Sequence, residues 1–346
     1  MLKIKATTKI FVYCPAGVIT GGAELLHQLV DLLNVNKLDA YIVYYGTDIS
    51  EIPSAYNMYD IKVAEEVVDN SDNVVVFYEA VFDKIRLIKY SQVCLWWLSV
   101  DNFFLCSSRY LILNDLIKYN LMFGFKVTLY KIYELIIKRN NLFTDNISLN
   151  WLKKLNVVNA YQSEYAQNFL INQGFKQTIP LSDYINTDFY KGFTTLDRKD
   201  IILYNPKKGL AFTKKIISRA NQFNWVAVQN MNRTELVKMF NISKLYIDFG
   251  YHPGKDRLPR EAVLNGCCVI TGVKGSARFF EDVPIENCYK FKQNGKSLNS
   301  IIETIQNVMT NYDSHVSNFN FYRNQILNEK QLFENQVKSL FQIDKV

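Results

Sequence analysis

The sequence predicts an α/β protein made of two doubly wound domains, each with a parallel sheet covered by helices on both faces. Three observations support this prediction. The chain has 346 residues, which is more than one hydrophobic core usually organises. Apolar strands alternate with amphipathic helices through most of the chain, as is typical of parallel sheets. This alternation stops near residue 177 and restarts near residue 200, which indicates two domains.

The first domain is predicted to cover residues 1–176. Leucines at helical spacing in "AELLHQLVDLLN" indicate one helix, and "SEYAQNFLINQG" indicates another that is capped by Ser163 and ends at Gly174. A strand in "NVVNAY" precedes this second helix. The other apolar strands are expected at residues 9–16, 40–46, 73–80 and 92–102.

Residues 177–199 contain a proline, a glycine and no clean period, so we interpret them as a linker. The second domain is predicted over residues 200–325, and residues 326–346 are expected to form a helix that packs back on the first domain. Asn232 and Glu235 have the spacing of a capping box at the start of a helix. The apolar strands are expected at residues 200–206, 225–228, 244–250 and 267–271.

The composition restricts the class of protein. Lys and Arg outnumber Asp and Glu by 40 to 33, and this mild, dispersed excess suits an anionic ligand or an anionic membrane surface rather than nucleic acid. The six cysteines show no CxxC spacing, which favours reduced core thiols. The first apolar run is too short for a signal peptide, and no run reaches the roughly 18 residues of a membrane span. We therefore expect a cytoplasmic location.

Polar clusters follow the strands of the second domain, and they read "NPKKG", "QNMNRTE", "YHPGKDRLPRE" and "GVKGSA". Because the carboxyl ends of parallel strands meet at one edge of a sheet, we expect these clusters to line a single ligand site. Lys207 and Lys208 can neutralise a diphosphate, and backbone N–H groups around Gly275 and Ser276 can bind its oxygens.

Another part of the same edge suits a sugar diol. Glu261 follows Pro259, a residue type favoured at the first position of a helix, and its carboxylate can accept hydrogen bonds from a ribose. Arg257 and Arg260 add positive charge beside it. No convincing DxD motif for a metal appears, so we expect neither a metal nor another cofactor.

The order of "GGAE", "SEYAQNFL", "KKG" and "PREAVLNGCCVIT" resembles the GT-B glycosyltransferases, and most closely a divergent branch of their glycogen-synthase-like retaining group. The resemblance covers residues 9–290. It implies two facing Rossmann-like domains with a cleft between them. It also implies transfer of a sugar from a nucleotide-diphosphate sugar to a glycan or lipid-linked acceptor, without a metal, in the synthesis of capsule, O-antigen or lipopolysaccharide.

The resemblance also implies roles for single residues. Lys208, with Lys207, would bind the donor diphosphate and Glu261 the nucleotide ribose. The turn formed by Gly21 and Gly22 would approach the donor phosphate or sugar. The segment that holds Asn230, residues 229–232, would meet the base.

The sequence departs from the family pattern at two places. Pro253 stands where the group often has a second Glu, and residues 204–206 replace a usual Arg. His252, Lys255 or Arg257 are the candidates for supplying the missing contacts. These departures leave both retention and inversion of configuration open.

Two strand-end carboxylates of the first domain are the candidate catalytic groups. Asp101 can contact an acceptor hydroxyl or act as the base of an inverting reaction, or it can cap the next helix instead. Glu79 ends the strand "VVVFY" in a similar position. Residues 103–143 mix aromatic and basic side chains, which fits either amphipathic helices packed on the domain or a face that rests on an anionic membrane.

Two other functions fit the same pattern. One is a nucleotide-sugar 2-epimerase on the same fold, although such enzymes usually carry more acidic and histidine residues in the site than the three histidines of this chain provide. The other is a non-catalytic subunit that binds a glycan or a nucleotide, which the incomplete pair of glutamates would explain.

Overall fold

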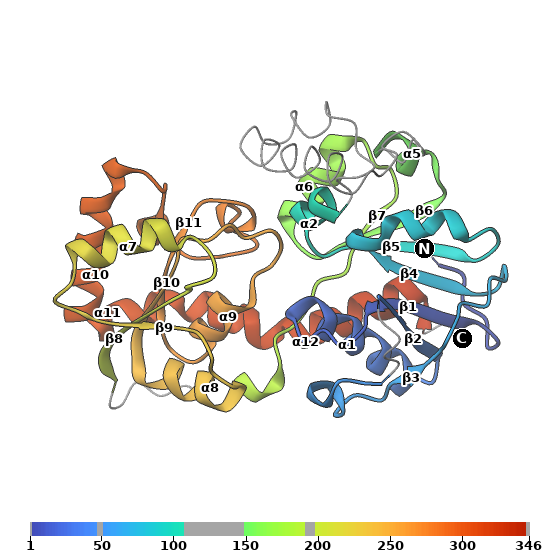
Figure 1. Ribbon diagram of the computed structural model, residues 1–346, viewed down its shortest axis with the longest axis horizontal. Helices are drawn as coiled ribbons and strands as arrows, with labels where there is room; N and C mark the ends of the chain where they lie inside the picture. The colour runs from blue at the N-terminus through green and yellow to red at the C-terminus, as the bar shows by residue number, and fades with distance from the viewer. Residues whose placement is uncertain (1, 47–50, 107–148, 191–197, 344–346) are drawn as a thin grey trace, which may run out of the picture. The chain divides into compact units, whose positions relative to one another are not determined.

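The computed structural model describes residues 2–46, 51–106, 149–190 and 198–343, and these form two compact units (Figure 1). The first unit contains residues 1–162, 166–182 and the chain from Glu334 onward. The second unit contains residues 163–165 and 183–333. Each unit holds one parallel sheet with helices between its strands, which confirms the predicted class of two Rossmann-like α/β domains.

The first unit is built on a seven-stranded sheet with the order β3-β2-β1-β4-β5-β6-β7. Every strand pair in it is parallel. Its elements are β1 Lys9–Pro15, α1 Gly21–Val35, β2 Asp39–Tyr45, β3 Lys62–Val63, β4 Val74–Tyr78, η2 Glu79–Leu87, β5 Gln92–Trp97, α2 Val100–Cys106, α5 Leu149–Lys154, β6 Val157–Tyr161, α6 Glu164–Gln173 and β7 Thr178–Pro180.

The second unit is built on a five-stranded parallel sheet with the order β12-β11-β10-β8-β9. Helix α10 contacts α7, whereas α8 contacts α9, as expected when right-handed crossovers place successive helices on both faces. Its elements are β8 Lys199–Tyr204, α7 Leu210–Arg219, β9 Asn224–Ala227, α8 Arg233–Ile242, β10 Ser243–Asp248, α9 Arg257–Leu264, β11 Cys268–Gly272, β12 Lys290–Phe291, α10 Leu298–Thr310, α11 Tyr312–Val316 and α12 Asn320–Phe341.

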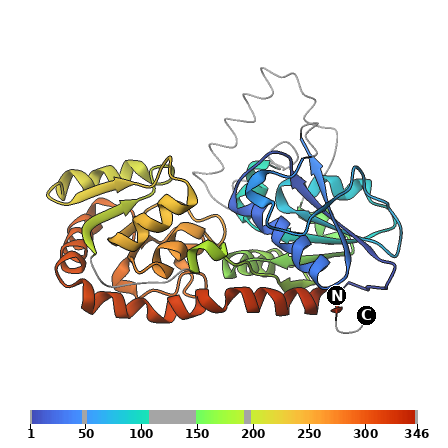
Figure 2. The same ribbon diagram turned by 90° about the horizontal axis from the view of Figure 1, so that it is seen from below.

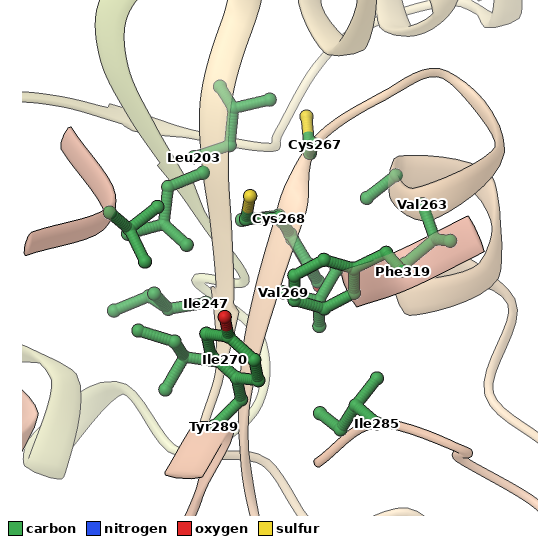
Figure 3. Packing of buried hydrophobic residues seen from close by; sticks show 14 of the residues in the cluster. Leu203, Ile247, Val263, Cys267, Cys268, Val269, Ile270, Ile285, Tyr289 and Phe319 are labelled. Carbon is green, nitrogen blue, oxygen red and sulfur yellow. The ribbon is translucent and has the colours of Figure 1, made fainter. Parts of the chain in front are cut away.

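The apolar runs read from the sequence form the core of each sheet. In the second unit, Leu203 of β8 and Ile247 of β10 lie in one hydrophobic cluster with Val269 of β11 (Figure 3). Phe319 packs into the same cluster from the C-terminal helical segment. Burial of this continuous apolar surface stabilises the sheet by about 25 cal/mol per Å² removed from water. The cysteines whose side chains the structure describes are free thiols, and among these Cys288 alone is exposed.

Two segments differ from the sequence prediction. Residues 178–180, expected in the linker, form β7 and pair in parallel with β6. A three-residue edge strand is too short to show a hydrophobic period, which explains why the pattern missed it. Helix α9 begins at Arg257, so Pro259 is its third residue and not its first.

Helix α12 is one long helix, drawn in red in Figure 2. Its residues from Glu334 onward belong to the first unit, where Ser182 N donates to Gln336 Oε1 at 2.7 Å. Among the residues that the structure describes, no helix has both the length and the apolar character of a membrane span.

The two inner strands β8 and β10 form the switch point of the second sheet, because the chain leaves β8 toward β9 and then returns to the other side of β8. The loops that follow them touch through their backbones. A Cβ atom on Gly209, which has a φ of +67°, would lie 2.1 Å from the carbonyl oxygen of Phe249. A Cβ atom on Gly250 would lie 2.5 Å from Lys208 Cβ. Glycine at both positions lets the two loops approach this closely.

We expect Gly209→Ala to destabilise the protein by about 2 kcal/mol or more, because the new methyl group meets backbone that cannot swing away and the left-handed conformation is strained. The free energy of unfolding in urea measures this loss. Gly295→Ala is the matched control, since nothing lies within 4 Å of a Cβ atom there. Equal stability of the two variants would contradict the role assigned to the glycine contact.

Candidate functional site

The candidate site lies at the carboxyl ends of β8 and β10, which is the edge where ligands bind in open parallel sheets. The turn after β8 is built by Asn205, whose Oδ1 accepts from Lys207 N at 2.9 Å. Lys208 follows directly and leads into Gly209, the residue that caps α7. The close packing of this turn against the loop after β10 therefore fixes the backbone position from which the Lys208 side chain extends.

Lys208 is paired with Asp256, a residue that sequence reasoning did not single out. The Lys208 Nζ lies 3.0 Å from Asp256 Oδ1 and 2.8 Å from Oδ2. Asp256 is the N-cap residue of α9, yet its side chain makes no capping hydrogen bond. The ammonium group of Lys208 is thereby held at the start of α9, whose dipole adds positive potential at the same place.

His252 lies beneath this pair and is fully buried. Its Nε2 is 3.5 Å from Asp248 Oδ1 and 3.9 Å from Asp256 Oδ2. Burial alone would lower the pKa of His252, but the carboxylates of Asp256 and Asp248 raise it above its ordinary value. His252 therefore lies between two carboxylates inside the loop, and its predicted role in donor binding stays a prediction.

Asp248 anchors the same cluster from the end of β10. Its carboxylate accepts hydrogen bonds from Tyr246 Oη at 2.8 Å, Asn205 Nδ2 at 3.1 Å and Gly250 N at 2.7 Å. Burial would raise the pKa of Asp248, but His252 and these donors hold it at about 2. The spacing of Asp248, His252 and Asp256 could also hold a metal ion, with one ligand atom from each within 4.8 Å of the others.

The loop after β11 is locked onto the loop after β10. A Cβ atom on Gly275 would lie 1.9 Å from the carbonyl oxygen of His252, so this position requires glycine. Ser276 N donates to His252 O at 2.8 Å, and Ser276 Oγ donates to Gly254 O at 2.6 Å. The backbone N–H and hydroxyl of Ser276 are therefore used to join two loops. This geometry favours a structural role over the donor contact that was predicted for Ser276.

The remaining predicted residues of this unit lie around the same edge. Arg257 is the first residue of α9 and Glu261 is a buried residue in its second turn. Lys207 is exposed next to Lys208. Asn230 is exposed after β9 and adopts a φ of +54°, a left-handed conformation that asparagine tolerates. Their predicted roles in donor binding stay predictions.

The expectation that Arg260 adds charge to the ligand site was wrong. Its guanidinium is fully buried and forms a bidentate ion pair with Asp183, at 2.9 and 2.6 Å. Arg260 Nη1 also lies 2.8 Å from Glu329 Oε2 of α12. Lys255 Nζ reaches Glu329 Oε1 at 2.8 Å. Arg260 lies on the face of α9 that is turned to the interior, and its ion pairs hold the helix in place.

In the first unit, the two predicted glycines begin α1. Thr20 caps this helix through its Oγ, which accepts from Ala23 N at 3.3 Å, and the helix starts at Gly21. A Cβ atom on Gly22 would lie 3.9 Å from Leu98 Cδ1, an ordinary contact. Packing within the unit therefore does not require glycine at position 22, and the predicted approach of a ligand to this turn stays a prediction.

Glu79 and Asp101, the two candidate catalytic carboxylates, are both buried. Leu98 N donates to Glu79 Oε2 at 2.8 Å, so Glu79 joins the ends of β4 and β5. Burial raises the pKa of Glu79 to about 8, although backbone N–H groups of Leu98 and Ser99 favour its charged form. Asp101 lies in the first turn of α2, where Ser99 Oγ accepts from Asn102 N and fills the capping role.

The catalytic roles of Glu79 and Asp101 stay predictions. For residues 103–143, the hypothesis of a basic membrane-facing surface falls mostly on residues 107–148, which lie outside the described part of the chain. The residues of the candidate site that sequence reasoning did not single out are Asp248 and Asp256. The signals were an acidic residue that ends an apolar strand and an acidic residue two positions before "LPRE".

Comparisons with known proteins found solved structures that are similar to this chain. No family model matches the chain, and no curated protein matches its sequence. A sucrose-phosphate synthase from Thermosynechococcus elongatus aligns with a TM-score of 0.65 and 11% identity, over 96% of this chain and 98% of the other. HepE from Anabaena, solved in complex with UDP-glucose, aligns with a TM-score of 0.60 and 11% identity, over 96% and 99%.

A third solved structure is WaaG, a glycosyltransferase involved in lipopolysaccharide biosynthesis. It aligns with a TM-score of 0.53 and 9% identity, over 96% of this chain and 98% of that one. At these identities the likeness establishes the fold. The chain has the GT-B class of fold, with two Rossmann-like domains, and it spans nearly the full length of these structures.

The pKa of Glu79 gives a test of how its carboxyl is held. A group whose folded pKa is raised from 4.5 to about 8 stabilises the fold below pH 4.5 and loses this contribution as the pH rises through 8. Glu79→Gln copies the protonated form. We expect it to differ from the wild type by less than about 1 kcal/mol at pH 5 and to be more stable by roughly 4 kcal/mol at pH 8.

Urea unfolding at both pH values measures this difference. Glu65→Gln, at an exposed position, is the control and should change little at either pH. A Glu79→Gln variant that is less stable than the wild type at pH 8 would show that Glu79 is held as a carboxylate.

Proposed function

We propose that this protein is a glycosyltransferase that moves a sugar from a nucleotide-diphosphate sugar to a glycan or lipid-linked acceptor. One observation carries the proposal. Lys208 is fixed at the switch point of the second sheet, next to the N-terminus of the helix that carries Glu261. A cation beside a helix N-terminus suits a diphosphate, and a carboxylate in the following turn suits a ribose diol.

The fold supports the same proposal. HepE, which aligns over 99% of its length with a TM-score of 0.60, was solved in complex with UDP-glucose. WaaG carries the name of a glycosyltransferase. We assign Lys207, Lys208 and Arg257 to the donor diphosphate, and Glu261 to the ribose.

We propose that the reaction proceeds without a metal. The leaving diphosphate needs positive charge, which Lys208 and the N-terminus of α9 supply at one point. The first unit would bind the acceptor, with Asp101 or Glu79 near the acceptor hydroxyl and Gly22 leaving space beside α1. The setting that we propose is surface polysaccharide synthesis at the inner face of the membrane. WaaG, whose structure is similar, is a glycosyltransferase involved in lipopolysaccharide biosynthesis.

Lys208→Met should weaken donor binding. In a thermal-shift screen against nucleotide-diphosphate sugars, a donor at 100 times its dissociation constant should stabilise the wild type by about 2.7 kcal/mol. We expect Lys208→Met to lose about half of this stabilisation or more, because the loss of a charge-assisted contact raises the dissociation constant at least about tenfold.

Lys244→Met is the matched control, because Lys244 also forms a surface ion pair, at 2.6 Å with Asp200, away from the site. A donor that stabilises Lys208→Met as fully as the wild type would contradict the assigned site. Incubation of the identified donor without acceptor then tests the reaction, since an epimerase would convert the donor by itself.

The membrane proposal concerns the basic residues of 103–143. If they bind an anionic surface, replacing Arg109, Lys118 and Lys126 with Gln should release the protein from vesicles that contain phosphatidylglycerol. Each basic residue near the surface contributes about 1 kcal/mol of attraction, so three changes should lower the bound fraction by at least tenfold. Cosedimentation measures this fraction, with neutral phosphatidylcholine vesicles as the control, and unchanged binding would refute the proposal.

A further inference from the structure

We propose that Asp256 occupies the place on Lys208 that the diphosphate of the donor takes. The donor would then bind by exchanging one anion for another on the same ammonium group. This inference rests on the proposed function, because it assumes that Lys208 binds a diphosphate. It assigns Asp256 as the residue that sets which anions the site accepts.

The geometry shows a carboxylate in the position of an anionic ligand. Both Asp256 oxygens lie within 3.0 Å of the Lys208 Nζ. The Lys208 side chain is 37% exposed and the Asp256 side chain 17% exposed, so an anion from solvent can reach this contact. By contrast, the ion pair between Arg260 and Asp183 is fully enclosed and cannot exchange.

Helix α9 does not use the Asp256 carboxylate. An aspartate at the N-cap usually accepts a hydrogen bond from the second or third backbone N–H of its helix. Here the third residue is Pro259, which has no N–H, and Asp256 makes no side-chain capping bond. The carboxylate is therefore turned to Lys208 and can leave it without breaking a cap. The helix dipole still favours an anion at this end.

The Asp256 carboxylate also has His252 as a neighbour. His252 Nε2 lies 3.9 Å from Asp256 Oδ2, on the buried side of the contact. Asp248 Oδ1 lies 3.5 Å from the same nitrogen, and the Asp248 carboxylate is also held by Tyr246, Asn205 and Gly250. When a diphosphate takes Lys208, the partly exposed Asp256 carboxylate can turn to solvent, and His252 keeps its contact with Asp248.

This exchange makes the site more selective between anions than a lysine without a competing carboxylate would be. A carboxylate or a singly charged phosphate ester offers Lys208 no more charge than Asp256 already does. A diphosphate carries two or more negative charges and several acceptor oxygens, so it can displace Asp256 and also reach the backbone N–H groups at the start of α9. Asp256 therefore favours a diphosphate over abundant weaker anions.

The test compares the binding of inorganic pyrophosphate to the full-length wild type and to three variants by isothermal titration calorimetry. We expect Asp256→Asn to bind pyrophosphate about two- to five-fold more tightly, as follows from the loss of one partly exposed ion pair that competes with the ligand. Lys208→Met should bind it at least about tenfold more weakly. Asp200→Asn breaks the similar Lys244 pair near the start of β8 and should bind as the wild type does.

A second measurement separates exchange at Lys208 from a general change in charge. Reductive methylation followed by mass spectrometry reports how accessible the Lys208 amine is in each protein. We expect Lys208 to react faster in Asp256→Asn than in the wild type, and pyrophosphate to protect it in both. Tighter binding with unchanged Lys208 reactivity would overturn the exchange, because the effect would then be long-range electrostatics.

The outcomes also separate this inference from the proposed function. If Lys208→Met binds pyrophosphate weakly but Asp256→Asn binds no more tightly than the wild type, the exchange is refuted and the donor site stands. If the wild type does not bind pyrophosphate, or if Lys208→Met binds it equally well, both the donor site and the exchange are refuted.

Discussion

The backbone contact between the loops after β8 and β10 is the constraint on which the rest of the candidate site depends. Gly209 and Gly250 allow this contact, because a side chain at either position would overlap the neighbouring loop. The contact brings Lys208, at the end of one strand, to Asp256, at the start of the helix that follows the other. Without it, a cation and a helix N-terminus would lie at the same sheet edge but not at the same point.

The charged residues around this contact differ in how deeply they are buried. The outer members, Lys208 and Asp256, are partly exposed, whereas His252 and Asp248 are buried. Buried charges are costly unless they are paired and hydrogen-bonded, and Asp248 meets this condition with three donors. The inner pair can therefore serve as fixed structure, and the outer pair remains the part of the cluster that a ligand can change.

The sequence could predict the fold and the edge of the sheet that carries the candidate site. Both predictions use local patterns, namely the spacing of apolar residues and the polar residues that follow each strand. It could not predict which polar side chains turn inward. Arg260 and Arg257 stand three positions apart in one basic run, yet Arg260 is enclosed by Asp183, 77 residues away in the sequence. Ser276 was predicted to contact a ligand, yet its hydroxyl donates to Gly254 O, a pairing that loop packing determines. Such pairings depend on tertiary contacts, and they produce no periodic pattern in the nearby sequence.

The burial of the Arg260 side chain explains how the exchangeable contact between Lys208 and Asp256 can lie beside a helix, α9, whose position is fixed. Arg260 and Lys255 tie the start of α9 to Glu329 of α12, and Asp183 holds the same guanidinium from the other side. Removing one partner of such a buried network costs several kcal/mol, so α9 and Glu261 stay in place when charges at the surface change. The position of the helix does not depend on the Asp256 carboxylate, which has no capping bond to lose. A rigid frame with one replaceable anion is what a site needs to release its product and bind the next donor without refolding its loops.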